Sequence, residues 1–120
     1  MQGYRELLVW QKAMALVEVI YREAKSFPRE ETYGLAAQMR RAAVSIPCNI
    51  AEGHGRRSTK DYLRFVAIAN GSLRELETQI EIAGRLGYWG KSVADALLGS
   101  ADELARMLHS LGLSLRRKLP

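Results

Sequence analysis

Apolar residues in this chain recur at intervals of three and four rather than at every second position. The longest series keeps its phase throughout: Tyr62, Val66, Ala69, Leu73, Leu76, Ile80, Ala83 and Gly87. A second unbroken series lies nearer the C-terminus: Ala94, Leu97, Ala101, Leu104, Leu108, Leu111 and Leu115. This spacing places the apolar side chains on one face of an α-helix.

The pattern predicts four helices, at about residues 5–26, 33–54, 59–86 and 92–115, and no strands. Because the joints between them are short, successive helices should be antiparallel neighbours. We therefore expect one domain over residues 1–120, an all-α, up-down-up-down four-helix bundle. Asn70-Gly71 is a common turn signal, but a turn would destroy the phase of the apolar series. We predict a continuous helix there, in which Gly71 and Ser72 let a neighbour approach closely.

Local signals mark the ends of these helices. Phe27-Pro28 ends the first, because the residue before a proline is pushed out of the helical region. The run Gly53-His54-Gly55 ends the second, since glycine can take the left-handed cap conformation. Ser58 is the expected N-cap of the third helix, with Asp61 three residues later as a variant of the capping box.

The second helix is apolar around most of its girth, and the first carries apolar residues on and off its seam, among them Leu8 and Met14. A helix of a small monomer needs only one apolar stripe. We therefore predict burial on more than one side, which indicates a homo-oligomer. Asn49 and Glu52 lie on the narrow polar strip of the second helix. We expect them to be structural, bonding this helix to a neighbour or to another subunit.

The formal net charge is +5 and the isoelectric point about 9.7. Residues 40–64 hold six basic and two acidic side chains, and the tail adds Arg116, Arg117 and Lys118. The basic side chains at the joint between helices two and three form a candidate phosphate-binding surface, because helix N-termini attract phosphate. The residues of this predicted nucleic-acid interface are Arg41, Arg56, Arg57, Lys60 and Arg64. The alternative is a solvated basic surface without a ligand. Tyr62 is the only aromatic residue beside it, so sequence-specific readout of single strands is not indicated.

No constellation of residues suggests catalysis. Cys48 has no histidine at helical spacing, as a nucleophile would need. His54 and His109 stand alone, and Glu75, Glu77 and Glu81 lack the Glu-x-x-His pairs of carboxylate-metal bundles. We therefore expect no enzyme activity, no metal and no cofactor. The N-terminus lacks the apolar core of a signal peptide, and no apolar run could cross a bilayer, so we expect a cytoplasmic protein without a membrane partner.

Two blocks of the sequence resemble a known bacterial family. They are YGLAAQMRRAAVSIPCNIAEG and RFVAIANGSLRELETQIEIAGRLGY. They resemble the four-helix-bundle proteins encoded in intervening sequences of 23S ribosomal RNA genes, over about residues 4–115. A similar bundle, the accessory variability determinant of diversity-generating retroelements, is a basic pentamer that works with a reverse transcriptase and nucleic acid. The resemblance implies a pentamer and leaves two hypotheses. One is a non-enzymatic, oligomeric protein that binds nucleic acid; the other is a scaffold that docks a protein partner such as a reverse transcriptase.

Overall fold

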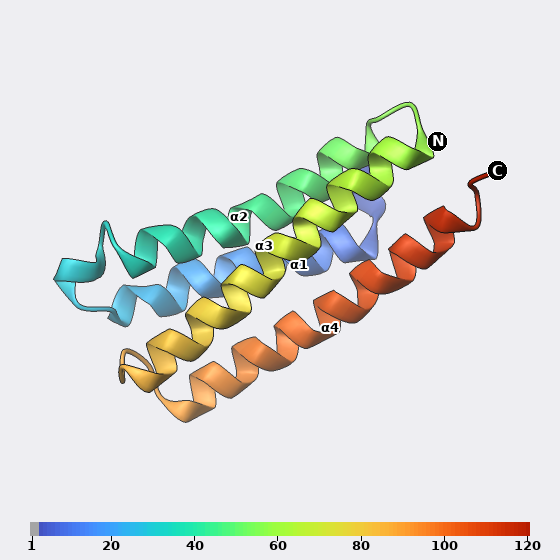
Figure 1. Cartoon of the computed structure of the whole chain (residues 1–120). Helices are drawn as coiled ribbons and strands as arrows, with labels where there is room; N and C mark the ends of the chain where they lie inside the picture. Colours follow the sequence, from blue (N-terminus) through green and yellow to red (C-terminus); the bar gives the residue numbers. More distant parts are fainter. Residues whose placement is uncertain (1–2) are drawn as a thin grey trace.

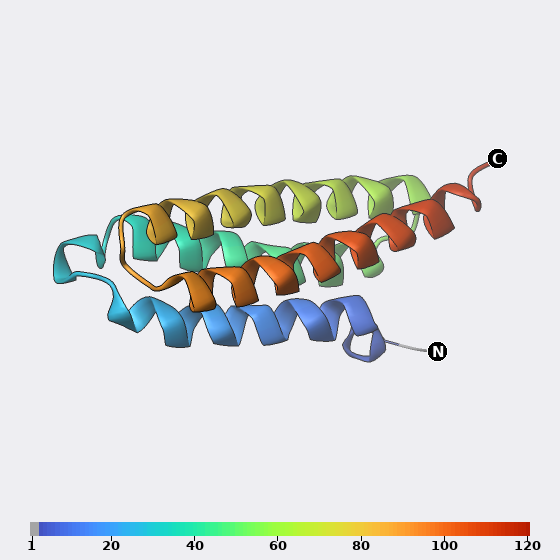
Figure 2. The same cartoon turned by 90° about the horizontal axis from the view of Figure 1, so that it is seen from below.

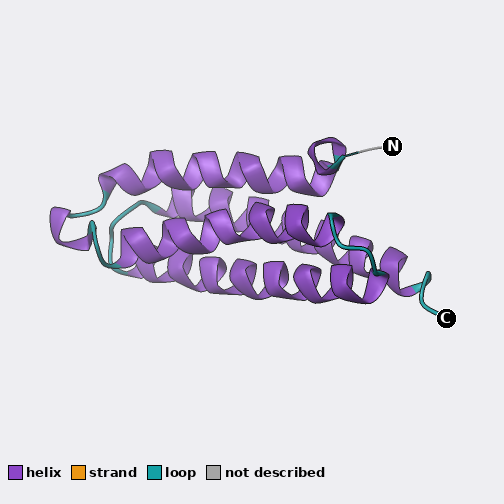
Figure 3. Cartoon of the chain, turned by 90° about the horizontal axis from the view of Figure 1, so that it is seen from above, coloured by secondary structure: helices purple, strands orange, loops and turns teal. Residues whose placement is uncertain are grey.

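The computed structural model describes residues 3–120 and contains four long helices. They are α1 (Leu8–Glu23), α2 (Leu35–His54), α3 (Thr59–Arg85) and α4 (Lys91–Arg116). The 3-10 turns η1 (Tyr4–Glu6), η2 (Ala24–Ser26) and η3 (Arg29–Glu31) flank the first two helices. Residues 3–120 form no strand (Figure 3). Each helix runs back along its predecessor, so the predicted all-α four-helix bundle is confirmed (Figure 1). The bundle is a rod of 49 × 23 × 21 Å.

The joint between α2 and α3 forms where the sequence predicts, but the expected left-handed glycine cap is wrong, because Gly55 ends α2 with φ of −81° and ψ of −3°. Ser58 has an extended backbone, and its hydroxyl accepts a hydrogen bond of 3.1 Å from the backbone N–H of Asp61. This bond satisfies one of the free donors of the first turn of α3. Beyond the joint, α3 continues without a break through Asn70 and Gly71, as the phase of the apolar series requires.

The expectation for Gly71 is wrong in one respect. A Cβ added to Gly71 would meet nothing within 4 Å, so no neighbour among residues 3–120 approaches it closely. Ser72 does face a neighbour, because its hydroxyl lies 2.8 Å from that of Ser45 on α2. The close approach of α2 and α3 occurs elsewhere, at Gly53. A Cβ there would lie 2.7 Å from the Cβ of Phe65.

The first helix is shorter than predicted at both ends. It begins at Leu8 because Leu7 is extended, with φ of −71° and ψ of 125°. The side chain of Gln11 donates to the carbonyl of Arg5 at 2.9 Å and holds the preceding turn in place. At its other end the last turn, Ala24–Ser26, tightens to a 3-10 helix ahead of the chain reversal at Pro28.

One hydrophobic core joins all four helices. Its fully buried large side chains come from every helix: Ile20, Met39, Ile46, Ile50, Leu73, Leu76, Ile80, Leu97, Leu104 and Leu108. Among the described residues, no large apolar side chain of α2 is exposed. Neighbouring helices α1 and α3 therefore cover the broad apolar surface of α2, which does not by itself require another subunit. On α1, Leu8, Met14 and Tyr21 remain exposed.

Hydrogen bonds of Glu31 and Ser26 tie the α1–α2 connection to the α3–α4 connection at the far end of the bundle. Its carboxylate accepts from the backbone N–H of Leu35 at 3.0 Å, which caps α2, and from the hydroxyl of Tyr88 at 2.8 Å. The hydroxyl of Ser26 donates to the backbone carbonyl of Tyr88. The two bonds to the carboxylate, first that from Leu35, lower the pKa of Glu31. The fold thus fixes this end through ionised Glu31.

Candidate nucleic-acid interface

Two cations at the α2–α3 joint point into solvent without a counter-ion. Arg57 lies in the connection and Lys60 in the first turn of α3, and both are exposed. Neither forms an ion pair within residues 3–120. A free cation beside a helix N-terminus is a suitable contact for phosphate, since the helix end adds partial positive charge.

Arg56 and Arg64 are held on the same surface by a shared ring. Their guanidinium carbons lie 4.7 and 4.8 Å from the centroid of the Phe65 ring. Each also has an acidic neighbour: Arg56 lies 3.4 Å from Glu52, and Arg64 lies 3.6 Å from Asp61. These exposed pairs contribute little to stability. They orient the two guanidinium groups but also offset part of their charge.

The joint beneath these cations is tightly packed. The Tyr62 ring meets His54 edge to face, with centroids 5.9 Å apart. Its hydroxyl is buried and finds no hydrogen-bond partner among the described atoms, and burial raises the pKa of Tyr62. The ring also lies against the backbone of Gly53. Tyr62 therefore serves packing here, and its ring is not a free surface on which a base could stack.

The basic tail lies at the same end of the bundle as the joint. The chain enters at this end, turns there between α2 and α3, and leaves there after α4 (Figures 1 and 2). We call this region the basic end and define it as residues 3–8, 52–65 and 112–120. It holds eight basic and three acidic side chains, a net charge of +5, and the remaining side chains are balanced. The basic end therefore accounts for the whole formal net charge.

The shared location of the basic tail and the α2–α3 joint could have been predicted from the sequence through the antiparallel topology. In an up-down-up-down bundle the joint after the second helix and the C-terminus must share one end. Arg116, Arg117 and Lys118 thus extend the predicted surface, and Arg5 of η1 lies nearby in the same region.

Arg41 does not belong to the basic end. It lies 15 residues before Arg56 along the chain, most of this path being helical, so the two α-carbons are separated by about 22 Å along the axis of α2. Its level on α2 is near that of Ser45, which contacts the middle of α3. Of the five predicted cations, the structure brings together Arg56, Arg57, Lys60 and Arg64 only.

The two predicted structural polar residues make local bonds, Asn49 within α2 and Glu52 to Arg56 in the joint that follows it. The side-chain amide of Asn49 donates to the backbone carbonyl and hydroxyl of Ser45, at 2.8 and 3.0 Å. Ser45 in turn contacts Ser72, so Asn49 reaches α3 only through this serine. Glu52 accepts from Arg56 instead of reaching a neighbouring helix. Neither residue forms a direct side-chain hydrogen bond to α3 in the described chain.

The other candidate chemistry stays dispersed. Cys48 is exposed on α2 rather than packed. No three His, Cys, Asp or Glu side chains in the described chain are grouped so that they could hold a metal ion. None of the helices formed by residues 3–120 combines the length and the apolar character that a membrane span needs.

Comparison with known proteins assigns a family and a fold. The model of the family described as "23S rRNA-intervening sequence protein" matches residues 5–110. Among curated proteins, none matches this chain. A crystal structure of a protein of unknown function from the S23 ribosomal protein family of Bacteroides thetaiotaomicron has a similar fold. It superimposes with a TM-score of 0.81 over 88% of this chain and 98% of that one, at 22% sequence identity.

Proposed function

The chain belongs to the family of 23S rRNA-intervening sequence proteins, and from its charge distribution we propose that it is a non-enzymatic protein that binds the phosphate backbone of nucleic acid through the basic end. One observation carries the proposal: the +5 formal charge of the chain is collected at one end of a 49 Å rod. Such a concentration attracts polyanions far more strongly than the same charge spread evenly.

The arrangement of the cations suggests how binding would begin. Arg57 and Lys60 are exposed and have no acidic partner in the described chain, so they would meet phosphate first. Arg116, Arg117 and Lys118 at the end of α4 would add contacts from the adjacent helix. Contacts of this kind position a nucleic acid without reading its bases. We therefore propose binding that depends on charge and shape and is largely independent of sequence.

The test is a fluorescence-anisotropy titration of duplex and structured RNA at several salt concentrations. The joint variant replaces Arg56, Arg57 and Lys60 with Gln, and the tail variant replaces Arg116, Arg117 and Lys118. Each should weaken binding of all sequences alike and should reduce the slope of log affinity against log salt by up to about one per lost phosphate contact. In the combined variant, the losses of affinity and of salt slope from the two sets should both be present.

The matched control lies at the opposite end of the rod. Replacing Arg22, Lys25 and Arg29 with Gln removes the same charge from three exposed positions there. This control should bind RNA nearly as well as the wild type. If all three triple variants lose affinity equally, net charge alone explains binding and the basic end is not a site. If the joint and tail variants keep full affinity, the scaffold hypothesis with a protein partner replaces this one.

We also propose that the protein self-associates. The support is on α1, where Leu8, Met14 and Tyr21 are 72%, 38% and 43% exposed. Five subunits would follow the resemblance to the pentameric bundle described above. Light scattering at micromolar concentration should give a multiple of the 13.5 kDa chain mass. A monomer for the wild type, or an unchanged assembly after Leu8→Ser and Tyr21→Ser, would refute a contact through α1.

A further inference from the structure

A groove of about 590 Å³ runs along the side of the bundle between α3 and α4. Its apolar floor consists of residues that are buried or half-buried: Leu63, Val66, Ala105, Leu108 and Gly112. From Asp102 to Arg116 its α4 wall extends over 14 residues, which is about 21 Å or four helical turns. The groove is thus long, straight and apolar at its base.

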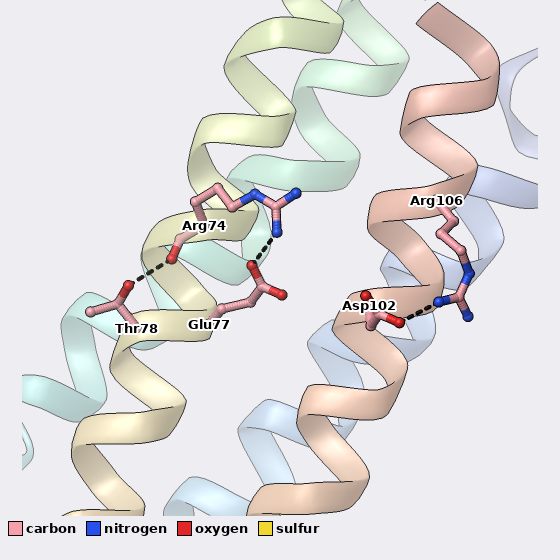
Figure 4. A network of polar contacts seen from close by, with 5 residues as sticks. All are labelled: Arg74, Glu77, Thr78, Asp102 and Arg106. Atoms are coloured by element: carbon pink, nitrogen blue, oxygen red, sulfur yellow. Dashed lines mark hydrogen bonds and ion pairs between the residues drawn. The ribbon is translucent and has the colours of Figure 1, made fainter.

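The rim of the groove is mainly positive. Arg74 stands on α3, and Arg106 and Arg116 stand on α4, so guanidinium groups occupy both walls. Asp102 is the only acidic residue that lines it. Figure 4 shows Arg74 and Arg106 on the neighbouring helices, each bonded to an acid of its own helix.

These intrahelical bonds orient the two arginines but leave some of their N–H donors free. Nη1 of Arg74 lies 2.7 Å from the carboxylate of Glu77, and Nη1 of Arg106 contacts the carboxylate of Asp102. A guanidinium group has five N–H donors, and one carboxylate uses at most two of them. Donors therefore remain on both walls for an acidic side chain that lies over the groove.

From this combination we propose that the α3–α4 groove binds an amphipathic helix of a partner protein, one whose apolar stripe is flanked by acidic side chains. The apolar residues would enter the floor at the i, i+3, i+4 and i+7 spacing of helix-in-groove complexes. Ala67 and Ala105 are small, so side chains of the ligand helix have room between the walls. The acidic flanks would meet the arginines on both sides.

The floor favours a helix over a nucleic-acid strand. Base stacking on single-strand binding proteins uses aromatic side chains, and no Phe, Tyr or Trp is among the residues that line this groove, although His109 is. Aliphatic side chains form the floor, and these make no hydrogen bonds to phosphate. The groove therefore differs in chemistry from the basic end, although the two share Leu63, Gly112 and Arg116.

The probe is a labelled 18-residue peptide with leucine at helical spacing and glutamate on both flanks, and its partner peptide carries lysine in place of glutamate. Ala67→Trp fills the groove from an exposed position, and Ala96→Trp is the matched control on an exposed part of α4 outside it. The acidic peptide should bind at least tenfold more tightly than the basic one. Ala67→Trp should weaken this binding at least tenfold, and Ala96→Trp should leave it unchanged.

Charge is tested separately with two double variants. Arg74→Gln with Arg106→Gln should weaken peptide binding by about fivefold per arginine, the upper range for an exposed ion pair. Arg41→Gln with Arg85→Gln removes the same charge outside the groove and should have no effect. The joint variant, which lacks Arg56, Arg57 and Lys60, should bind the peptide as the wild type does.

Four results would overturn the proposal. The first is absence of binding of the acidic peptide, and the second is an equal loss in both double variants. In the third, Ala67→Trp lowers the assembled mass but leaves peptide binding intact, which assigns the groove to a second copy of the chain. In the fourth, Ala67→Trp weakens RNA binding and not peptide binding, which assigns it to nucleic acid. The first three results can be read whether or not the basic end binds RNA, and the fourth applies only if the protein binds RNA.

Discussion

At Gly53, α2 packs directly against α3, and one added methyl group tests how tightly the joint is packed. A Cβ on Gly53 would lie 2.7 Å from the Cβ of Phe65, 3.0 Å from Cδ1 of Tyr62 and 3.3 Å from the Tyr62 carbonyl oxygen. The nearest atom is the Cβ of Phe65, which is bonded directly to the backbone and cannot move aside unless α3 moves. Overpacking of this kind costs about 1–3 kcal/mol.

The intrinsic preference of alanine for helices offsets part of this cost. In a helix interior alanine is favoured over glycine by about 1 kcal/mol, and by less near the helix end where Gly53 lies. We therefore expect Gly53→Ala to lower the free energy of unfolding by about 1–2 kcal/mol. For a chain of this size, each kcal/mol corresponds to a change in Tm of about 4 °C, so Tm should fall by about 4–8 °C.

Gly71→Ala is the matched control, because the same methyl group meets nothing within 4 Å in the middle of α3. There the helix preference acts alone, and stability should rise by about 0.5–1 kcal/mol. Thermal unfolding followed by far-UV circular dichroism should therefore place the two variants on opposite sides of the wild type. If both variants raise Tm, α2 and α3 are not in close contact at Gly53, and the packing described for the joint is wrong.

Three other changes probe the polar contacts and the core. Glu31→Gln should destabilise the protein more at neutral than at acidic pH. The lowered pKa of Glu31 means that its contribution is present above its ordinary value of 4.5 and is lost as pH falls through the folded-state pKa. Urea unfolding at several pH values should show the two proteins converging in acid; a constant difference would contradict this. Ser72→Ala removes the partner of Ser45 and should cost about 1 kcal/mol, with measurable coupling in a double-mutant cycle with Ser45→Ala. Leu104→Ala opens a cavity at a fully buried position and should cost about 2–5 kcal/mol by urea unfolding; a smaller loss would mean that the core around α4 can collapse.

Helix number, order and direction could be predicted because the apolar spacing is a local signal. Continuity of α3 through Asn70-Gly71 followed from the phase of Leu73 and the residues after it, and the cap at Ser58 followed from residue type and spacing. The start of α1 could not be predicted, since Leu7 is extended although its side chain is a good helix former. Tertiary contacts decide where such a helix begins, and the local sequence does not reveal those contacts.

The covering of α2 shows a different limit of the sequence. Its apolar girth correctly indicated burial on several sides, but a pattern cannot tell a neighbour in the same chain from one in another chain. The structure shows α1 and α3 in that role, whereas exposed large apolar side chains lie on α1, on α3 (Ile68, Ile82) and on α4 (Leu113). The groove between α3 and α4 could not be predicted from the sequence either. It depends on the three-dimensional arrangement of two helices, which the sequence pattern does not specify near Ala105 and Gly112.

The position of the cations, in contrast, was available once the topology was assumed. Because helix direction alternates along the chain, the joint at Arg57 and the tail at Arg117 must lie at one end of the rod. What the sequence did not give was the pairing of Arg56 and Arg64 with acids, which singles out Arg57 and Lys60 as free cations in the described joint.

Because the net charge lies at one end, the molecule has a preferred orientation near a charged surface and holds its other end away from that surface. Near a polyanion it should align end-on, with its axis pointing away from the anionic surface. Ionic screening reduces electrostatic interactions over about 8 Å at physiological salt, whereas the rod is 49 Å long. The exposed side chains at the opposite end, Tyr33 and Leu86, therefore stand several screening lengths from whatever the basic end holds. Contacts made there would be insensitive to the charge of that ligand, so each end of the rod could be occupied without affecting the affinity of the other.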